Sequence, residues 1–88
     1  MTEKELERKL KALANRRRLA ILKFLNKTTK ASVGNIAREI KLSFKSTSRH
    51  LSVLLLVDIV EKDQQGLMAF YSLVTPVSHP TKQILLMC

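Results

Sequence analysis

The chain has 88 residues and carries 16 Lys and Arg against 7 Asp and Glu, a net charge of +9. This length predicts a single domain over residues 1–88 with a modest core, which dimerisation would supplement. Hydrophobic residues make up 45% and charged residues 26% of the chain. Both values are close to globular averages and argue against wholesale disorder.

The N-terminal sequence and the cysteine content indicate a cytoplasmic protein. Met1-Thr-Glu-Lys-Glu lacks the apolar core of a signal peptide, and no run approaches the ~18 apolar residues of a membrane span. The single cysteine, Cys88, cannot form an internal disulfide, which fits a reducing compartment. We therefore expect no membrane partner.

The first helix is predicted to begin at a capping-box pattern made by Thr2 and Glu5. Leu6, Leu10 and Leu13 then mark one face of a charged helix. So narrow an apolar stripe suits the helix of a partner subunit better than a core of its own.

Asn15 is the predicted cap of a second helix, whose broad apolar face over residues 19–25 indicates burial. Arg16, Arg17 and Arg18 lie in its first turn, where the helix dipole disfavours cations. This local conflict suggests that the arginines serve an anion. The alternative is that they are simply solvated.

A helix-turn-helix is predicted over residues 32–57, with Ser32 and Ser43 as the two caps. The inner stripe of its second helix consists of Phe44, Thr47, Leu51 and Leu54. Hydroxyls and cations fall roughly opposite: Lys45, Ser46, Arg49 and Ser52. Such a face can pair with base edges in a DNA major groove, although a polar helix face is often only solvated.

The charge distribution favours nucleic acid as the partner. Ten of the 16 cations lie between Arg16 and Arg49, together with a single acid, Glu39. That segment therefore holds the whole positive excess, as a polyanion-binding surface requires. An anionic membrane is disfavoured because the segment contains several short helical patterns instead of one long amphipathic helix.

A β-hairpin is predicted over residues 59–74, with strands at 59–62 and 67–73 joined by a turn at 63–66. Pro76 and Pro80 break any continuation. Residues 81–88 can form a short apolar helix or a loose tail. The expected fold class is mainly α with a small β-hairpin, a winged helix-turn-helix of order α-α-α-α-β-β-α.

Three segments in this order resemble the ArsR family of small repressors. They are residues 10–22 (LKALANRRRLAIL), residues 48–54 (SRHLSVL), and Gly66 followed by residues 70–73 (FYSL). The resemblance covers roughly residues 6–74 and implies a homodimer in which the recognition helix enters a major groove and the wing flanks it. The segments implied to dimerise are 1–14 and 81–88, with Leu6, Leu10, Leu13, Ile84 and Leu85 as the contacts. The DNA contacts that the resemblance implies are Ser43, Lys45, Ser46, Ser48, Arg49, Lys62, Gln64 and Gln65. Arg16 and Arg17 are predicted DNA contacts because of the arginine cluster at the start of the second helix.

The sequence departs from this family where many members bind a metal through a Cys-x-Cys pair. Ser32 and Gly34 occupy those positions. The whole chain offers only Cys88, His50 and His79 as soft ligands. We expect no metal, no cofactor and, in the absence of a catalytic constellation, no enzymatic activity.

Five further positions carry local expectations. The methyl group of Thr47 should pack while its hydroxyl bonds back to the helix, and His50 should be a packed imidazole bonded to backbone. Asp58 should adopt the left-handed conformation that ends the preceding helix. Leu56 and its neighbour Val53 fall on the outer side, where they either dock a partner or are covered by Leu85, Leu86 or the first helix.

The preferred hypothesis is a sequence-specific transcriptional regulator, acting as a repressor on an inverted-repeat operator. A non-specific architectural DNA-binding protein is the second hypothesis, and its affinity would not change when the operator is scrambled. A winged-helix protein-interaction module is the third, and it would tolerate Arg49→Ala and Lys45→Ala. The basic segment supports the first two, and the hydroxyl-rich helix face favours the first.

Overall fold

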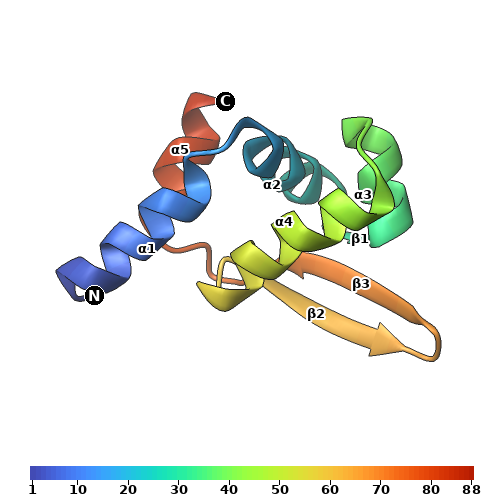
Figure 1. Cartoon of the computed structure of the whole chain (residues 1–88). Helices are drawn as coiled ribbons and strands as arrows, with labels where there is room; N and C mark the ends of the chain where they lie inside the picture. The colour runs from blue at the N-terminus through green and yellow to red at the C-terminus, as the bar shows by residue number, and fades with distance from the viewer.

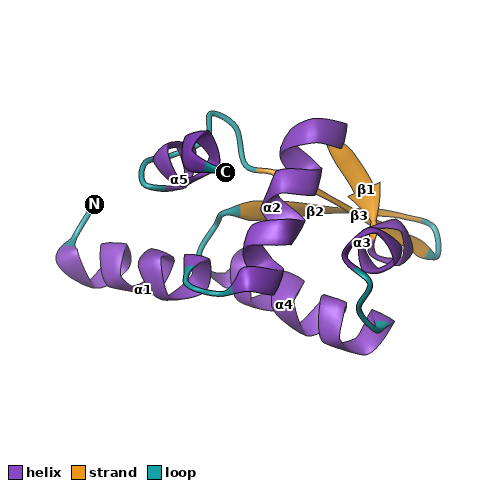
Figure 2. Ribbon diagram, turned by 90° about the horizontal axis from the view of Figure 1, so that it is seen from above, coloured by secondary structure: helices purple, strands orange, loops and turns teal.

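The computed structural model describes residues 1–88 and contains five helices and three strands. Along the chain these are α1 (Glu3–Leu13), α2 (Arg16–Thr28), β1 (Lys30–Ser32), α3 (Val33–Ile40), α4 (Phe44–Leu56), β2 (Val60–Gln65), β3 (Met68–Leu73) and α5 (Thr81–Met87). The winged helix-turn-helix prediction is confirmed. Helices α1 and α5 lie at one end of the molecule, and the β2–β3 hairpin tip lies at the other (Figures 1 and 2).

All four predicted helix caps are present. The Asn15 side-chain oxygen accepts from the backbone N–H groups of Arg17 (2.9 Å) and Arg18 (3.1 Å). The hydroxyl oxygens of Thr2, Ser32 and Ser43 each accept from the N–H three residues later. Each cap satisfies backbone donors that the first turn of a helix leaves free, so the sequence itself fixes where these helices begin.

The sheet has the order β1-β3-β2 and is antiparallel throughout. Strand β1, which pairs Ser32 with Phe70, was not predicted because three residues are too few to show an alternating pattern. The hairpin is tighter than predicted. Gln65 pairs with Met68, so the turn consists of Gly66 and Leu67, with Gly66 at φ 62°.

The core is built around α2, which buries Ile21, Leu22 and Leu25 against α3, α4 and the sheet. Leu13 also belongs to this core and is only 2% exposed. The prediction that Leu13 contacts a partner subunit is therefore wrong, because its own chain already covers the side chain. None of the five helices has the length and apolar character needed to cross a bilayer.

Two predictions about the inner side of α4 are also corrected. Thr47 is fully buried as expected, but its hydroxyl has no hydrogen-bond partner and does not bond back to the helix. Phe44 is 63% exposed and lies outside the core, because it is the first residue of α4 and the buried side of this helix begins three residues later at Thr47. Asp58, by contrast, adopts the predicted left-handed conformation with φ 57°.

Candidate nucleic-acid interface

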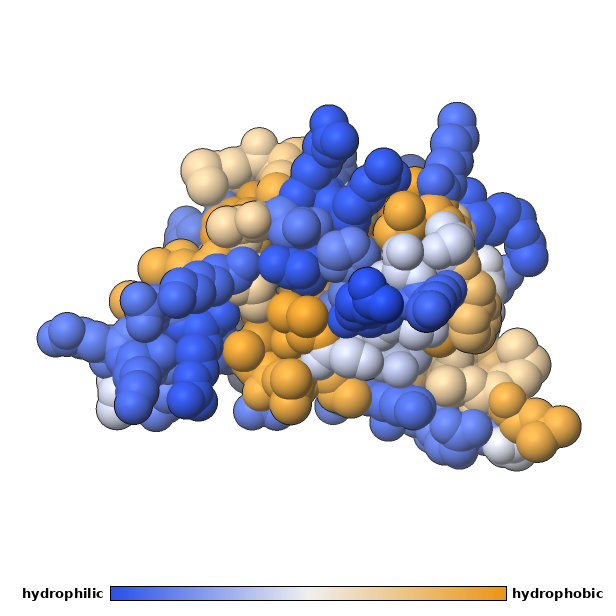
Figure 3. Space-filling model, in the orientation of Figure 1, coloured by the Kyte–Doolittle hydropathy of each residue, from blue (hydrophilic) through white to orange (hydrophobic).

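The outer face of α4 presents cations and hydroxyls to solvent, as predicted. Lys45, Arg49 and Ser52 are exposed, whereas the opposite face is anchored by fully buried Leu51 and Leu54. Neither Lys45 nor Arg49 takes part in an ion pair within the chain. Hydrophilic side chains cover the middle of α4 in the space-filling view, beside an apolar cluster at its C-terminal end (Figure 3). The helix therefore offers uncompensated positive charge on a surface of its own.

The remaining predicted contacts of α4 lie at the start of the same face. Ser43 is exposed, and Ser46 and Ser48 are partly exposed. The Ser43 oxygen already accepts from the Ser46 N–H at 3.1 Å, so its O–H remains available to donate. Ser48 uses its backbone carbonyl to accept from the Ser52 hydroxyl at 3.0 Å. Ser43 thus caps α4 and still has a free O–H donor, and the side chains of Ser46 and Ser48 remain partly accessible to a ligand.

The three arginines at the start of α2 have different environments. Arg16 is exposed, and Arg17 donates from Nη1 to the carbonyl of Ile40 at the end of α3 (3.5 Å). Arg18 donates to two carbonyls at the end of α1, those of Ala12 (2.5 Å) and Lys11 (3.3 Å). A cation at the C-terminal end of a helix is stabilised by the helix dipole. Arg18 is therefore a structural residue, and the prediction that all three arginines serve an anion is wrong for it.

His50 joins α4 to the start of α2. Its Nδ1 lies 3.2 Å from Arg18 Nη1, so the imidazole accepts from the guanidinium, and the predicted backbone partner is wrong. Burial and then the positive charges of Arg18, Arg17 and Arg49 hold the pKa of His50 below its ordinary value of 6.5. The contact between Arg18 and His50 therefore places the start of α2 beside the middle of α4.

The wing carries the other three predicted DNA contacts, and all of them are exposed. Lys62 makes no ion pair. The Gln64 side-chain amide donates to the carbonyl of Gly66 (3.1 Å), and that of Gln65 donates to Asp63 (2.8 Å). Because Gln64 and Gln65 belong to β2, their backbones are held in the sheet and are not part of a loop.

The wing strand β2 carries two acids, Glu61 and Asp63, of which Asp63 is paired. Lys30 lies 2.7 Å from its carboxylate, and the hydrogen bonds from Lys30 and then Gln65 hold the pKa of Asp63 below its ordinary value. The Lys30 ammonium also lies 5.9 Å from the centre of the Phe70 ring. This pairing offsets the negative charge that would otherwise oppose an approaching polyanion.

Helices α1 and α5 leave apolar surface uncovered at the end of the molecule opposite the wing. Leu6 and Leu10 are 38% and 45% exposed and line an open groove of 380 Å³ on α1. Ile84 and Leu85 are half-buried against the core, whereas Leu86 and Met87 are 74% and 79% exposed. The terminal helix is formed, and the sequence analysis missed that its last turn is the more exposed part.

Between α1 and α5 four large apolar side chains are exposed as well: Phe44, Leu56, Leu67 and Met68. Leu56 at the end of α4 is 85% exposed, so neither α5 nor α1 covers it. Phe44 and Leu67 flank a groove of 390 Å³ between the wing and α3. A helical wheel could not identify Phe44 as exposed, because its angle matches the core side and only its place at the helix end removes it from the core.

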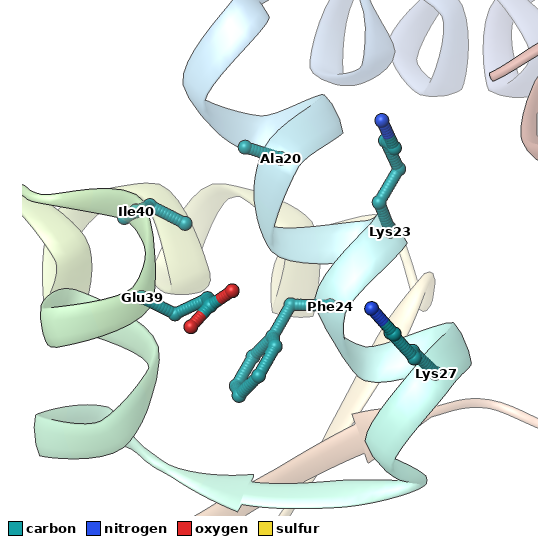
Figure 4. Close-up of a pocket in the computed structure, with 6 residues that line it drawn as sticks. All are labelled: Ala20, Lys23, Phe24, Lys27, Glu39 and Ile40. Atoms are coloured by element: carbon teal, nitrogen blue, oxygen red, sulfur yellow. The ribbon is translucent and has the colours of Figure 1, made fainter.

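Another groove, of 310 Å³, lies on the surface between α2 and α3 (Figure 4). The Phe24 ring and the Glu39 carboxylate point into it, and Lys23 and Lys27 line it from α2. No ion pair joins Glu39 to either lysine. No group of three or more His, Cys, Asp or Glu side chains is arranged to hold a metal ion anywhere in the chain.

The family model for bacterial regulatory proteins of the arsR family matches residues 15–62, from the cap of α2 into β2. The chain belongs to the ArsR family. This ArsR-family chain is a winged-helix, DNA-binding transcriptional regulator and not an enzyme, which confirms the resemblance seen in the sequence. No curated protein sequence matches it.

Solved structures of ArsR-type regulators share the fold. HlyU from Vibrio cholerae has a TM-score of 0.79 and 31% identity, with coverage of 94% of this chain and 83% of HlyU. A homodimeric winged helix-turn-helix DNA-binding domain from Mycobacterium bovis has a TM-score of 0.80 and 26% identity, covering 96% and 74%. The transcriptional repressor PagR of Bacillus anthracis has a TM-score of 0.77 and 27% identity, covering 98% of both chains.

Proposed function

We propose that this chain is a transcriptional repressor that binds an inverted-repeat operator as a homodimer. The observation that carries the proposal is the exposed, unpaired positive charge on the outer face of α4. Lys45 and Arg49 are exposed and make no ion pair, and the start of α2 lies beside this helix through the Arg18–His50 contact. Concentrated positive charge on a helix that fits a major groove is the arrangement required for DNA recognition.

In the proposed complex α4 lies in the major groove and supplies the contacts to base edges. Arg49 and Lys45 have the length and charge to pair with guanine O6 and N7 or with phosphates. The hydroxyls of Ser43, Ser46 and Ser48 add short donors and acceptors near the start of the helix. Buried Leu51 and Leu54 fix the orientation of these side chains by anchoring the opposite face.

Outside α4, the proposed contacts position the protein along the DNA backbone. Arg16 and Arg17 lie at the start of α2 and are proposed to contact phosphates, which carry affinity but no sequence information. Lys62, Gln64 and Gln65 are proposed to contact the groove beside the one that holds α4. The wing turn lies at the far end of the molecule from α1 and α5 (Figure 1), so it would flank the outer side of each half-site.

The proposed homodimer pairs α1 and α5 across a two-fold axis through Leu6, Leu10, Ile84 and Leu85. The partly exposed leucines of α1 and the exposed end of α5 support it, because such surface is costly to leave in water. The homodimeric state of the Mycobacterium bovis neighbour supports it as well. The repressor role is supported by the similarity to PagR. A two-fold dimer implies half-sites about one helical turn apart.

Selection of bound sequences from a random duplex DNA pool tests this function. We expect an inverted repeat to be enriched, and we expect scrambling the enriched sequence to weaken binding about a thousandfold or more. Affinity for both duplexes should fall steeply with salt. If no sequence is enriched and all duplexes are bound in a salt-sensitive way, the result would contradict the repressor proposal and support a non-specific architectural DNA-binding protein.

A further inference from the structure

An exposed aromatic ring stands at the start of the proposed recognition helix, where the fold gives it nothing to pack against. Phe44 is the first residue of α4 and is 63% exposed. It lines the 390 Å³ groove whose other walls come from the start of α3 and the wing turn, including Leu67. Because α1 and α5 lie at the opposite end of the molecule (Figure 1), the proposed dimer leaves this ring uncovered.

Phe44 projects past the N-terminal end of α4. Side chains of a helix tilt toward its N-terminus, and Phe44 is the first residue of α4. On the helical wheel it falls beside Leu51, on the side of the core and away from Lys45 and Arg49, so only its place at the start of the helix leaves the ring exposed. The N-terminal residues of a recognition helix are the ones that contact base edges.

The walls of the groove favour a nucleic acid over a protein as the occupant. Arg38 supplies a cation from α3, and none of the residues that line the groove is acidic. Its guanidinium donates from Nη1 to the Asn35 side chain at 3.3 Å and makes no ion pair. An apolar surface rimmed by an unpaired cation, between a recognition helix and a wing, fits a strand that carries phosphates on one side and methyl-bearing bases on the other.

We infer that Phe44 is a specificity-determining residue that reads the C5 methyl group of a thymine in each operator half-site. This inference rests on the proposed function. Thymine presents its methyl group in the major groove, and an aromatic ring recognises it by apolar contact. A phenyl ring has no hydrogen-bonding group with which to read guanine or cytosine. The selected operator therefore contains a thymine at a fixed position in each half.

The experiment exchanges each thymine of the enriched operator for deoxyuridine, which lacks only the C5 methyl group. Affinities of the full chain are measured by fluorescence anisotropy. We expect an exchange in one half-site to weaken wild-type binding about fourfold, the value of one buried methyl group, and an exchange in both half-sites to weaken it about fifteenfold. Phe44→Ala should weaken binding to the thymine operator and should bind the thymine and uracil operators equally. Phe44→Leu should keep part of the discrimination, because it retains an apolar side chain.

Leu56→Ala is the matched control, because it removes an exposed apolar side chain from the other end of α4. It should remain as sensitive to the uracil exchange as the wild type. Thermal unfolding checks that Phe44→Ala is folded, which its exposure predicts. Operator-specific binding without any uracil-sensitive position that depends on Phe44 would overturn this inference and leave the proposed function intact. A pool without an enriched sequence would overturn both.

Discussion

The guanidinium of Arg18 lies 3.2 Å from Nδ1 of His50 and at the same time donates to the carbonyls of Lys11 and Ala12. One side chain thereby ties the end of α1 and the start of α2 to the middle of α4. The helix proposed to dimerise and the helix proposed to read DNA are thus fixed relative to each other. The spacing of two recognition helices in a dimer depends on such a connection, because half-site separation is set by geometry.

Alanine substitutions at Arg18 and Arg16 should have different effects, one on stability and the other on DNA binding. Arg18→Ala leaves two carbonyls of α1 and the imidazole without their donor, and we expect the free energy of unfolding to fall by about 1–3 kcal/mol. Arg16→Ala removes an exposed cation from the same turn and should leave that free energy within about 0.5 kcal/mol of the wild type. It should still weaken DNA binding. Chemical denaturation and anisotropy measure the two effects, and equal destabilisation by both changes would contradict the structural role of Arg18.

The environment of His50 predicts a stability that falls in mild acid. The pKa of His50 is lowered in the folded protein by burial and by Arg18, Arg17 and Arg49, so the unfolded chain binds the proton more tightly. The stabilisation that neutral His50 gives to the folded protein is fully present above the unfolded pKa of 6.5. It is lost as pH falls through 6.5 toward the lower folded pKa. His50→Gln should flatten the dependence of the unfolding free energy on pH in this window. An unchanged slope in His50→Gln would contradict this account.

Arg49 and Lys45 should differ from a matched cation outside the proposed interface. Arg49→Ala and Lys45→Ala should each cost about 1–3 kcal/mol of binding free energy on the selected operator if they read bases. A phosphate contact would instead weaken operator and scrambled duplex alike and reduce the salt slope by about 1. Lys27→Ala, which removes a charge from the groove between α2 and α3, should change neither. Unaltered binding by both α4 variants would favour a protein-interaction module.

The substitution Leu10→Glu tests the proposed dimer interface. The Leu10 side chain is 45% exposed on α1, so Leu10→Glu should preserve the fold of each subunit while placing a charge in the proposed interface, where desolvation is costly. Sedimentation should then show a monomer, and operator binding should weaken because the two half-sites are no longer held together. Leu56→Glu carries the same charge on an exposed leucine of α4 and should remain dimeric. A dimer of wild-type stability in Leu10→Glu would move the interface elsewhere.

Helix starts and the wing could be read from the sequence because each depends on local chemistry. Asn15, Ser32 and Ser43 accept from nearby N–H groups, and such bonds need only the right residue just before an apolar pattern. The left-handed conformation of Asp58 likewise follows from its place just after the end of a helix. These features belong to stretches of a few residues, and tertiary packing did not alter them.

The errors arise where distant parts of the chain meet. The helical periodicity predicted a buried Phe44, because a wheel does not show where along α4 the core ends. It assigned Leu13 to a partner subunit, because the pattern of one helix does not show which other parts of the same chain cover it. Thr47 is buried without a partner for its hydroxyl, and His50 binds Arg18 from another helix. Strand β1 exists only because β3 lies beside it. None of these contacts is encoded within one helix or strand.

The proposed DNA-binding surface, formed by α4, the start of α2 and the wing, is tested most directly by mapping backbone amide shifts in NMR spectra as the selected operator duplex is added. We predict that the largest changes fall at the start of α2, along residues 43–52 and in the wing, and that amides around Lys23 and Lys27 change little. Changes centred on the groove between α2 and α3, with α4 unaffected, would contradict the account.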